Sequence, residues 1–294
     1  MDLAYLRAHP GQLPAFLTHQ RIRETPVGGG SICAARRLTL EDGTSLFAKS
    51  WPGPGPTPPG FFAAEAAGLR WLREAGAVPV PEVLVELPDL LALEWVEPGR
   101  PDPVAAERFG RDLAALHRRG ADHFGAPWPG YLGSLPQDNH GNGAWPEWFA
   151  ERRLRPYLRI SADRGALGVA DVTLLDGLLA RLDRYAGPPE PPARLHGDLW
   201  PGNLLWAADG RCWLVDPAAH GGHRETDLAQ LALFGGAPYL DRILAAYAEA
   251  WPLADGWPAR VPLHQLHLLL VHTALFGAGY RGAVVDAVGR ALRA

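Results

Sequence analysis

The sequence contains almost no lysine. Among its 28 lysine and arginine residues, Lys49 is the only lysine, and every other basic position carries arginine. Isoleucine, asparagine and methionine are also scarce, whereas arginine, alanine, leucine, proline and glycine are abundant, a bias typical of a GC-rich genome. Under such a bias, a retained lysine indicates a position that needs a compact ammonium group rather than a planar guanidinium.

Other absences exclude whole classes of protein. There are two cysteines, Cys33 and Cys212, which argues against a disulfide framework or a structural zinc site and fits a reducing cytoplasm. The formal net charge of -4 offers no basic field for nucleic acid. The sequence opens without a signal-peptide pattern, and its apolar stretch at 266–276 is too short and too polar to span a bilayer. We therefore expect a cytoplasmic protein that binds neither nucleic acid nor a membrane.

The first 97 residues have the pattern of a small, β-rich lobe. A short helical segment (2–19) precedes two strands that flank a glycine turn, and an Asp-Gly turn leads into a third strand at 45–51. A proline-rich loop (52–60) separates this strand from a helix at 61–75, and two short strands follow at 83–87 and 90–96. This order predicts a sheet with one helix inserted between its third and fourth strands.

The remaining residues have a mostly helical pattern. A proline-rich break at 98–103 is the expected lobe boundary. Helices are predicted at 104–119, 146–160, 172–185 and 224–234, with two or three more toward the end, whereas 120–146 reads as loop and 195–216 as short strands and turns. The sequence thus predicts an α+β protein with a small, β-rich lobe (1–97) and a larger, mostly α-helical lobe (98–294).

Four features suggest one chemistry because of their order. The glycine turn is followed by Lys49 on the next strand, by Glu65 on the next helix, and by the segment LHGDLWPGN (195–203) ahead of a strand that ends in Asp216. Asp198 and Asn203 have the Asp-x-x-x-x-Asn spacing of the protein-kinase catalytic loop. As a turn residue alone, Asp198 would not account for the motifs on both sides of it.

Phosphoryl transfer requires groups of these kinds. It needs a backbone cradle over the nucleotide phosphates, a cation held by a carboxylate, a base near the accepting hydroxyl, and hard oxygen ligands for Mg²⁺. Lys49 with Glu65 would supply the cation and its partner, and Asp198 the base. Asn203 and Asp216 would hold the metal ion. The expected cofactors are therefore ATP and Mg²⁺. Residues 1–97 would form the nucleotide-binding lobe, and residues 98–294 the catalytic and substrate-binding lobe.

Longer motifs resemble the fructosamine kinase family (ketosamine-3-kinases), in the aminoglycoside-phosphotransferase branch of the protein-kinase-like fold. The segments that carry the resemblance are LHGDLWPGNLLW (195–206), GHRETDLAQLALFGG (222–236) and LALEWVEPG (91–99), supported by WFAERRL (148–154) and LFGAGYRG (275–282). The resemblance implies a bilobal fold and ATP-dependent phosphorylation of the O3 hydroxyl of ketosamines, the adducts of sugars with amines. Because that phosphate makes the adduct labile, the reaction would repair glycated proteins or clear small glycated metabolites.

The resemblance also implies roles for individual residues. Gly29, Gly30 and Ser31 would contact the phosphates, while the backbone of Glu94, Trp95 and Val96 would meet the adenine. Trp200 and His272 would face the sugar. His196, Arg224, Glu225 and Asp227 would support the catalytic loop. Many relatives have a cysteine directly after the glycines that is linked to redox control. Ser31 stands there in this chain, so we expect no such thiol switch and a packed Cys33.

Alternatives remain open from the sequence alone. A kinase of an aminoglycoside, choline or another amino alcohol would share Lys49, Asp198, Asn203 and Asp216, although Trp200 with GHRETDLA favours ketosamines. A nucleotide-binding protein without activity is disfavoured by the full catalytic set, and a metal hydrolase by the lack of clustered ligands. The carrier amine, the sugar and the oligomeric state do not follow from the sequence.

The histidines do not form a metal-binding pattern in the sequence. His220 and His223 lie in turns without a matching cysteine or carboxylate pattern, so we expect no zinc site there. His264 and His267 fall in one helical region, where a metal site is one interpretation and a polar helix face is the favoured one.

Overall fold

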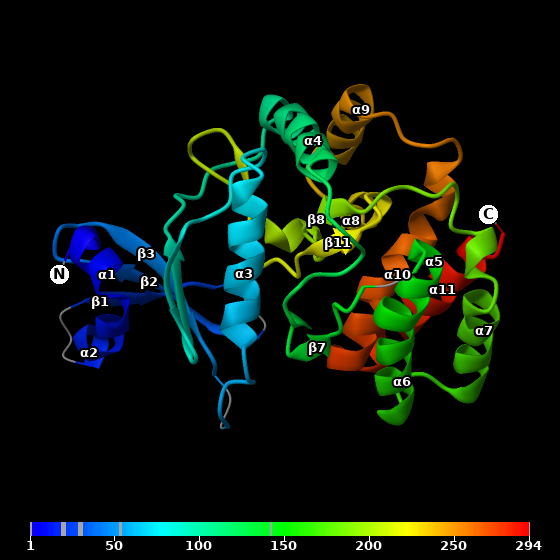
Figure 1. Cartoon of the computed structure of the whole chain (residues 1–294), viewed down its shortest axis with the longest axis horizontal. Coiled ribbons are helices and arrows are strands. Elements are labelled where there is room, and N and C mark those ends of the chain that lie inside the picture. The colour runs from blue at the N-terminus through cyan, green and yellow to red at the C-terminus, as the bar shows by residue number, and fades with distance from the viewer. Residues whose placement is uncertain (1, 19–21, 29–31, 53–54, 142, 294) are drawn as a thin grey trace.

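The chain folds into two lobes (Figure 1). The computed structural model describes residues 2–18, 22–28, 32–52, 55–141 and 143–293. A sheet with three helices forms the N-terminal lobe, and helices with short hairpins form the other, so the predicted bilobal α+β fold is confirmed. Within these residues no helix has the length and apolar character needed to cross a membrane.

The N-terminal lobe is built on a five-stranded antiparallel sheet. Its strands are β1 (Arg23–Pro26), β2 (Ala34–Thr39), β3 (Ser45–Ser50), β4 (Val83–Leu87) and β5 (Leu90–Glu94), in the order β1-β2-β3-β5-β4. Side chains alternate between the two faces of a strand. On β3, Leu46 and Ala48 therefore enter one core of the lobe, while Phe47 and Lys49 face the opposite side.

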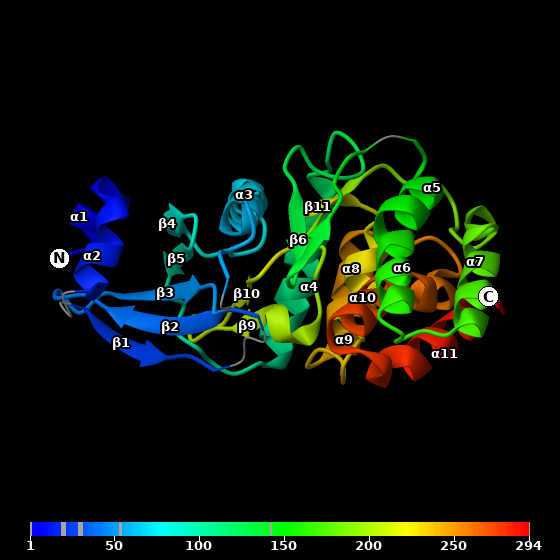
Figure 2. The ribbon, with the colours of Figure 1, turned by 90° about the horizontal axis from the view of Figure 1, so that it is seen from below.

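Helices cover both faces of this sheet (Figure 2). The short helices α1 (Leu3–Ala8) and α2 (Leu13–Thr18) bury Leu6 and Leu13 against one face. Helix α3 (Phe61–Glu74) covers the other, and its apolar positions recur every three or four residues, which gives it one buried stripe. The side chain of Lys49 consequently points to the same side of the sheet as α3.

The C-terminal lobe is mostly helical. Its helices are α4 (Pro103–Arg118), α5 (Trp145–Phe149), α6 (Arg155–Asp163), α7 (Val169–Leu179), α8 (Glu225–Gln230), α9 (Leu240–Ala250), α10 (Trp257–Phe276) and α11 (Arg281–Ala291). Helix α4 starts sharply because the Asp102 carboxylate accepts hydrogen bonds from the amides of Val104 and Ala105. Helix α10 lies in the middle of the lobe, with α6, α8 and α11 packed around it (Figure 2).

Three short two-stranded antiparallel sheets complete the described part of this lobe. They pair β6 (Gly130–Leu132) with β7 (Leu135–Gln137), β8 (Ala193–Leu195) with β11 (His220–Gly222), and β9 (Leu204–Trp206) with β10 (Cys212–Leu214). The first of these falls in the segment that we predicted to be loop, because three-residue strands are too short to show an alternating pattern. Three predicted elements also end two or more residues early, β5 at Glu94, α7 at Leu179 and α8 at Gln230.

The segment between the lobes is pinned to the β9–β10 hairpin. The Gly99 amide donates to the Trp206 carbonyl (2.7 Å), and the Ala208 amide donates to the Glu97 carbonyl (2.9 Å). A Cβ atom on Gly99 would lie 2.5 Å from the backbone of Ala207, so this close approach requires glycine. The connection therefore holds the N-terminal lobe against the hairpin that precedes Asp216.

Candidate active site

One cavity of about 860 Å³ lies between the lobes. Most of the residues that we predicted to act in catalysis or to bind the nucleotide, the metal ion or the sugar line this cavity. They are Lys49, Glu65, Glu94, Trp95, Val96, Asp198, Trp200, Asn203, Asp216 and His272. Residues 29–31, the predicted phosphate contacts, lie outside the described residues, although Gly28 lines the cavity. Side chains from positions far apart in the chain are thus brought to one cleft, the usual setting of a small-molecule site.

Lys49 is the centre of an ion-pair cluster that joins the lobes. Its Nζ atom lies 2.6 Å from Oε1 of Glu65 on α3 and 2.6 Å from Oδ1 of Asp216, after β10. The Lys49 side chain is 7% exposed and that of Glu65 12%, whereas that of Asp216 is 48% exposed. Asp216 adopts φ 54°, a left-handed conformation that is unusual for a residue other than glycine and is concentrated at functional sites.

The protonation of this cluster follows from burial and charge. Burial by itself would lower the pKa of Lys49, but Asp216 and Glu65 outweigh it and hold the pKa above its usual value. Burial raises the pKa of Glu65 to about 7, although Lys49 opposes the shift. The pKa of Asp216 is lowered, because Lys49 outweighs its burial. Lys49 therefore stays charged.

Asp198 and Asn203 face each other across a tight turn. The Asn203 amide Nδ2 donates to the Asp198 backbone carbonyl (2.8 Å) and to its carboxylate Oδ2 (2.9 Å). Oδ1 of Asp198 is buried without a hydrogen-bond partner. Burial raises the pKa of Asp198 well above its usual range, a shift that Asn203 opposes and that Asp216 and Asp227 increase. The carboxylate is thus prepared to gain a proton or to meet a cation.

Helix α8 clamps the loop that carries Asp198. The fully buried Asp227 carboxylate accepts from the amides of His196 (2.8 Å) and Gly197 (2.9 Å), and it also contacts Nε2 of His117. One turn later, Gln230 Oε1 accepts from the Leu199 amide (2.7 Å). The sequence argument missed Gln230, although the three-residue spacing from Asp227 places both on one helix face.

His196 fixes the loop from within. Its Nε2 lies 2.9 Å from the Val215 carbonyl, and its Nδ1 accepts from the Asp198 amide (3.3 Å). These two contacts require the proton on Nε2. The side chain therefore links the strand that leads to Asp216 with the loop that carries Asp198.

Arg224 and Glu225 do not contact the loop that carries Asp198, contrary to the prediction that they support it. Arg224 forms a bidentate ion pair with Glu190 (2.7 and 2.8 Å) and stacks on Trp251. Glu225 forms a bidentate ion pair with Arg260 (2.8 and 2.6 Å). Both lie at the start of α8, where the helix meets the segment between α9 and α10, so they anchor the helix rather than the loop.

Three potential metal ligands meet in the core of the C-terminal lobe. The ligand atoms of His223, Glu225 and His264 lie within 4.8 Å of one another, a grouping that the sequence argument did not find. Both oxygens of Glu225 are used by Arg260, and His264 Nδ1 lies 2.9 Å from the Thr226 hydroxyl. Burial lowers the pKa of His223 to about 3. The Glu225 carboxylate is thus committed to a guanidinium rather than free for a metal ion.

The prediction that His264 and His267 lie on a polar face of a helix is wrong. His264 and His267 are fully buried, because neighbouring helices surround this part of α10 on every side. The imidazole of His267 packs near the rings of Phe149 and Tyr157, and burial lowers its pKa well below the usual range. Both histidines are core side chains.

Aromatic side chains gather at the end of the cleft beyond Asp198. Trp200 and His272, the predicted sugar contacts, lie there with Phe234, Phe276 and Tyr280. Phe234 bridges the group, with ring centroids 5.7 Å from Trp200 and 4.4 Å from His272. The sequence argument did not assign Phe234, Phe276 or Tyr280, although all three lie in the motifs that carry the resemblance. These residues meet at this end of the cleft because of the way in which α8 and α10 pack, which the sequence does not show.

Cys33 borders the opposite part of the cleft. It is half-buried, and burial raises the pKa of its thiol to about 11. The thiol is therefore protonated at neutral pH, which makes it a poor nucleophile.

Comparison with known proteins gives the family. The profile of the family described as fructosamine kinase matches residues 13–294. A probable ketoamine kinase of Thermus thermophilus is 39% identical over 234 residues, 79% of this chain and 82% of that one. The chloroplastic protein-ribulosamine 3-kinase of Arabidopsis thaliana is 32% identical over 279 residues, 91% of this chain and 82% of its own length.

Solved structures support the same grouping. A structure from Thermobifida fusca, named as a candidate fructosamine-3-kinase, has a TM-score of 0.89 at 53% identity and covers 96% of this chain and 99% of that one. An aminoglycoside phosphotransferase structure, with a TM-score of 0.64 at 14% identity over 96% and 97% of the two chains, shares the fold. The chain belongs to the fructosamine kinase family, and it is an ATP-dependent kinase of ketosamines.

Proposed function

We propose that the enzyme transfers the γ-phosphoryl group of ATP to the O3 hydroxyl of a ketosamine, with Asp198 as the base. A bond forms between O3 and the γ-phosphorus while the bond from that phosphorus to the β-phosphate bridging oxygen breaks. ADP leaves, and the O3 proton passes to the Asp198 carboxylate. The observation that carries the proposal is the meeting of Lys49, Glu65, Asp198, Asn203 and Asp216 in one cleft between the lobes.

The charged groups divide the work of phosphoryl transfer. Lys49, held by Glu65, would contact the α- and β-phosphates, and the backbone at 94–96 would meet the adenine. Asn203 commits its amide nitrogen to Asp198, which leaves its amide oxygen for a cation, and Asp216 adds a half-exposed carboxylate. These hard oxygen donors fit Mg²⁺, which would neutralise charge on the phosphates when bound. Fixing these groups before the reaction lets them stabilise the transition state without rearrangement.

The raised pKa of Asp198 suits a general base. A carboxylate that is buried among other carboxylates binds a proton more readily than one in water, and a base works best when its pKa lies near the working pH. The clamp from Asp227 and Gln230 holds the loop backbone, so that Asp198 keeps its position while the substrate binds.

The aromatic side chains at the end of the cleft support an amine-linked sugar as the acceptor. Trp200 directly follows the loop leucine beside Asp198, and its ring lies over Gly202, where a Cβ atom would come within 2.1 Å of the indole. Indole and phenyl faces suit the apolar face of a sugar ring and the ammonium of the linking amine. Because the O3 phosphate makes the adduct labile and so frees the amine, the reaction would be a deglycation step.

Replacing Asp198 tests the assignment. Asp198→Ala is expected to lower kcat by about 10²–10⁴-fold, the usual contribution of a general base. Asp209→Ala, in the exposed β9–β10 turn, is the matched control and should keep wild-type turnover. Unfolding curves would establish that both variants fold. Wild-type turnover in folded Asp198→Ala would refute the role of Asp198.

A substrate panel tests the acceptor separately. ATP consumption would be compared for a fructosamine, a ribulosamine and an erythrulosamine, and for choline and an aminoglycoside. Ketosamines should have the highest kcat/KM, and Trp200→Ala should raise their KM while leaving the KM for ATP unchanged. A preference for choline or the aminoglycoside would contradict the proposed substrate class.

A further inference from the structure

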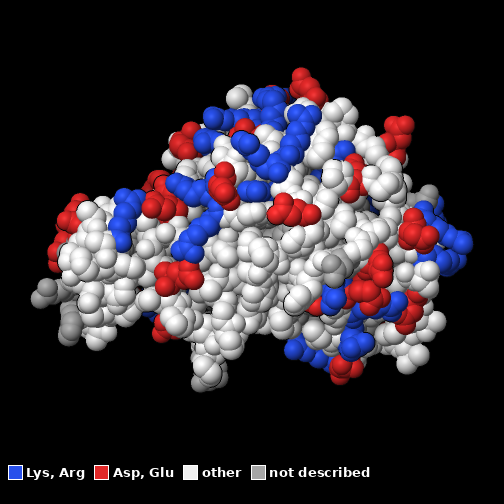
Figure 3. Space-filling model, in the orientation of Figure 1, with Lys and Arg blue, Asp and Glu red and all other residues white. Residues whose placement is uncertain are grey.

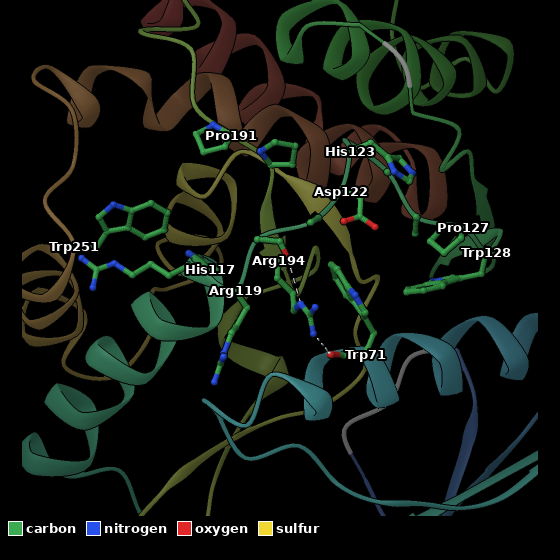
Figure 4. A pocket seen from close by; sticks show the side chains of 16 residues that line it. Trp71, His117, Arg119, Asp122, His123, Pro127, Trp128, Pro191, Arg194 and Trp251 are labelled. Atoms are coloured by element: carbon green, nitrogen blue, oxygen red, sulfur yellow. Dashed lines mark hydrogen bonds between the residues drawn. The ribbon is translucent and has the colours of Figure 1, made fainter.

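A second cavity, of about 620 Å³, lies where the ends of α3 and α4 approach each other (Figure 4). Its walls come from the end of α3, the end of α4, the segment 120–128 and strand β8 with the residues before it. Trp71, Trp128 and Trp251 line it, with Trp251 and Trp128 at opposite ends in the close view. The catalytic groups of the proposed reaction are not among its lining residues.

Three arginines give this cavity a positive charge. Arg118 and Arg119 come from the end of α4, and Arg194 comes from β8. None of the three forms an ion pair within the described part of the chain, and Asp122 is the one carboxylate among the described lining residues. Figure 3 shows many basic side chains, with some acidic ones among them, over α4 and the upper end of α3. A concave surface with unbalanced charge concentrates anions.

Neutral groups hold these arginines in place. Arg118 donates to the Ala250 carbonyl (2.6 Å), Arg119 to the Ala75 carbonyl (3.1 Å), and Arg194 to the Trp71 carbonyl (2.7 Å). A carbonyl orients a guanidinium without cancelling its charge, and each guanidinium has five N–H donors. Donors therefore remain for an anion, and part of the entropic penalty of ordering the side chains has already been met.

Indole rings lie next to two of the charges. The Arg194 guanidinium stacks over Trp71 at 4.4 Å from the ring centroid, and Arg118 lies 5.5 Å from the ring of Trp251. Trp128 meets Trp71 edge to face, with centroids 5.7 Å apart. The cavity therefore combines arginine donors for an anion with rigid apolar surface. This combination suits a ligand that has an anionic group and an apolar part.

The cavity is connected to the active site through two elements. Helix α3 carries Trp71 to the cavity and Glu65 to Lys49, and β8 carries Arg194 two residues ahead of His196. Trp128 lines both cavities. Because Arg194 donates a hydrogen bond to the Trp71 carbonyl, the strand before the loop that carries Asp198 is tied to α3, whose Glu65 pairs with Lys49.

We propose that this cavity is a second ligand site, which binds a phosphate monoester with a planar apolar body and thereby alters nucleotide binding through α3. The phosphate would take the free donors of Arg118, Arg119 and Arg194, whose planar forks match phosphate oxygens. The apolar body would lie against the indoles. A ligand that contacts both Trp71 and Arg194 favours one position of α3, and hence of Glu65 relative to Lys49.

Phenyl phosphate is the probe for this site. Its binding would be measured by calorimetry with the interlobe cleft saturated by ADP, for wild type, for Arg118→Ser/Arg119→Ser and for Arg108→Ser/Arg111→Ser. The last variant removes the same charge from the same helix outside the cavity. Neither pair touches the proposed catalytic groups, so both variants should keep basal turnover.

The expected result is saturable binding to wild type and to the control, with an affinity at least tenfold weaker in Arg118→Ser/Arg119→Ser. Phenyl phosphate should also change the KM for ATP in wild type and in the control but not in that variant. Absence of saturable binding, or equal affinity in all three proteins, would overturn the site. Binding that leaves the KM for ATP unchanged would overturn the link through α3.

Discussion

Replacing Lys49 by arginine tests why the sequence keeps a single lysine. The substitution preserves the charge, so any effect must come from shape. In the folded enzyme, Nζ of Lys49 lies 2.6 Å from a carboxylate oxygen of Glu65 and 2.6 Å from one of Asp216, and the side chain is 7% exposed. A guanidinium is larger and planar, and it cannot occupy this position without moving one of the two carboxylates.

The size of the effect follows from this lack of space. Adding atoms to a packed site typically costs about 1–3 kcal/mol, and a displacement of about 1 Å in a catalytic arrangement can cost about 10²-fold in rate. We therefore expect Lys49→Arg to fold with somewhat reduced stability and to lose about 10²-fold in kcat/KM, which corresponds to about 2.7 kcal/mol of transition-state stabilisation.

The assay is ATP-dependent phosphorylation of a synthetic fructosamine, with urea unfolding of the same samples. Arg36→Lys provides a matched control, because Arg36 lies opposite Ala48 on the neighbouring strand with its side chain 45% exposed. That variant should keep wild-type kcat/KM. If folded Lys49→Arg also keeps wild-type kcat/KM, the retained lysine reflects codon usage and the geometric argument is wrong.

Two further predictions concern the stability of the folded enzyme. The pKa of Glu65 is raised to about 7, so folded Glu65 binds a proton more readily than unfolded Glu65, and its contribution to stability is lost as the pH rises from about 4.5 to 7. The stability of Glu65→Gln relative to wild type should therefore increase across this range in urea unfolding, and a difference that does not vary with pH would contradict the assignment. Gly99→Ala should destabilise the protein by about 1–3 kcal/mol through overpacking against Ala207. Gly177→Ala, in α7 with open space around it, should stabilise it by up to about 1 kcal/mol, and similar unfolding midpoints for the two variants would refute the close approach at Gly99.

Much of the fold could be predicted because its elements are long and regular. The helix at 61–75 and the strand at 45–51 show clear periodicity, and both exist close to their predicted bounds as α3 and β3. The β6–β7 hairpin was missed because its strands have three residues each. The buried positions of His264 and His267 could not be read from α10 itself, since they depend on the helices that pack around it.

By itself, the sequence determined the chemical inventory of this enzyme. Local motifs supplied a lone lysine, the Asp-x-x-x-x-Asn spacing and a strand ending in aspartate, because phosphoryl transfer requires particular side chains at short, recognisable spacings. Only the tertiary structure decided which distant residues meet. It placed Lys49 between Glu65 and Asp216, Gln230 beneath the catalytic loop, and Arg118 and Arg194 around a second cavity. Such meetings arise from the packing of elements far apart in the chain, which no local pattern contains.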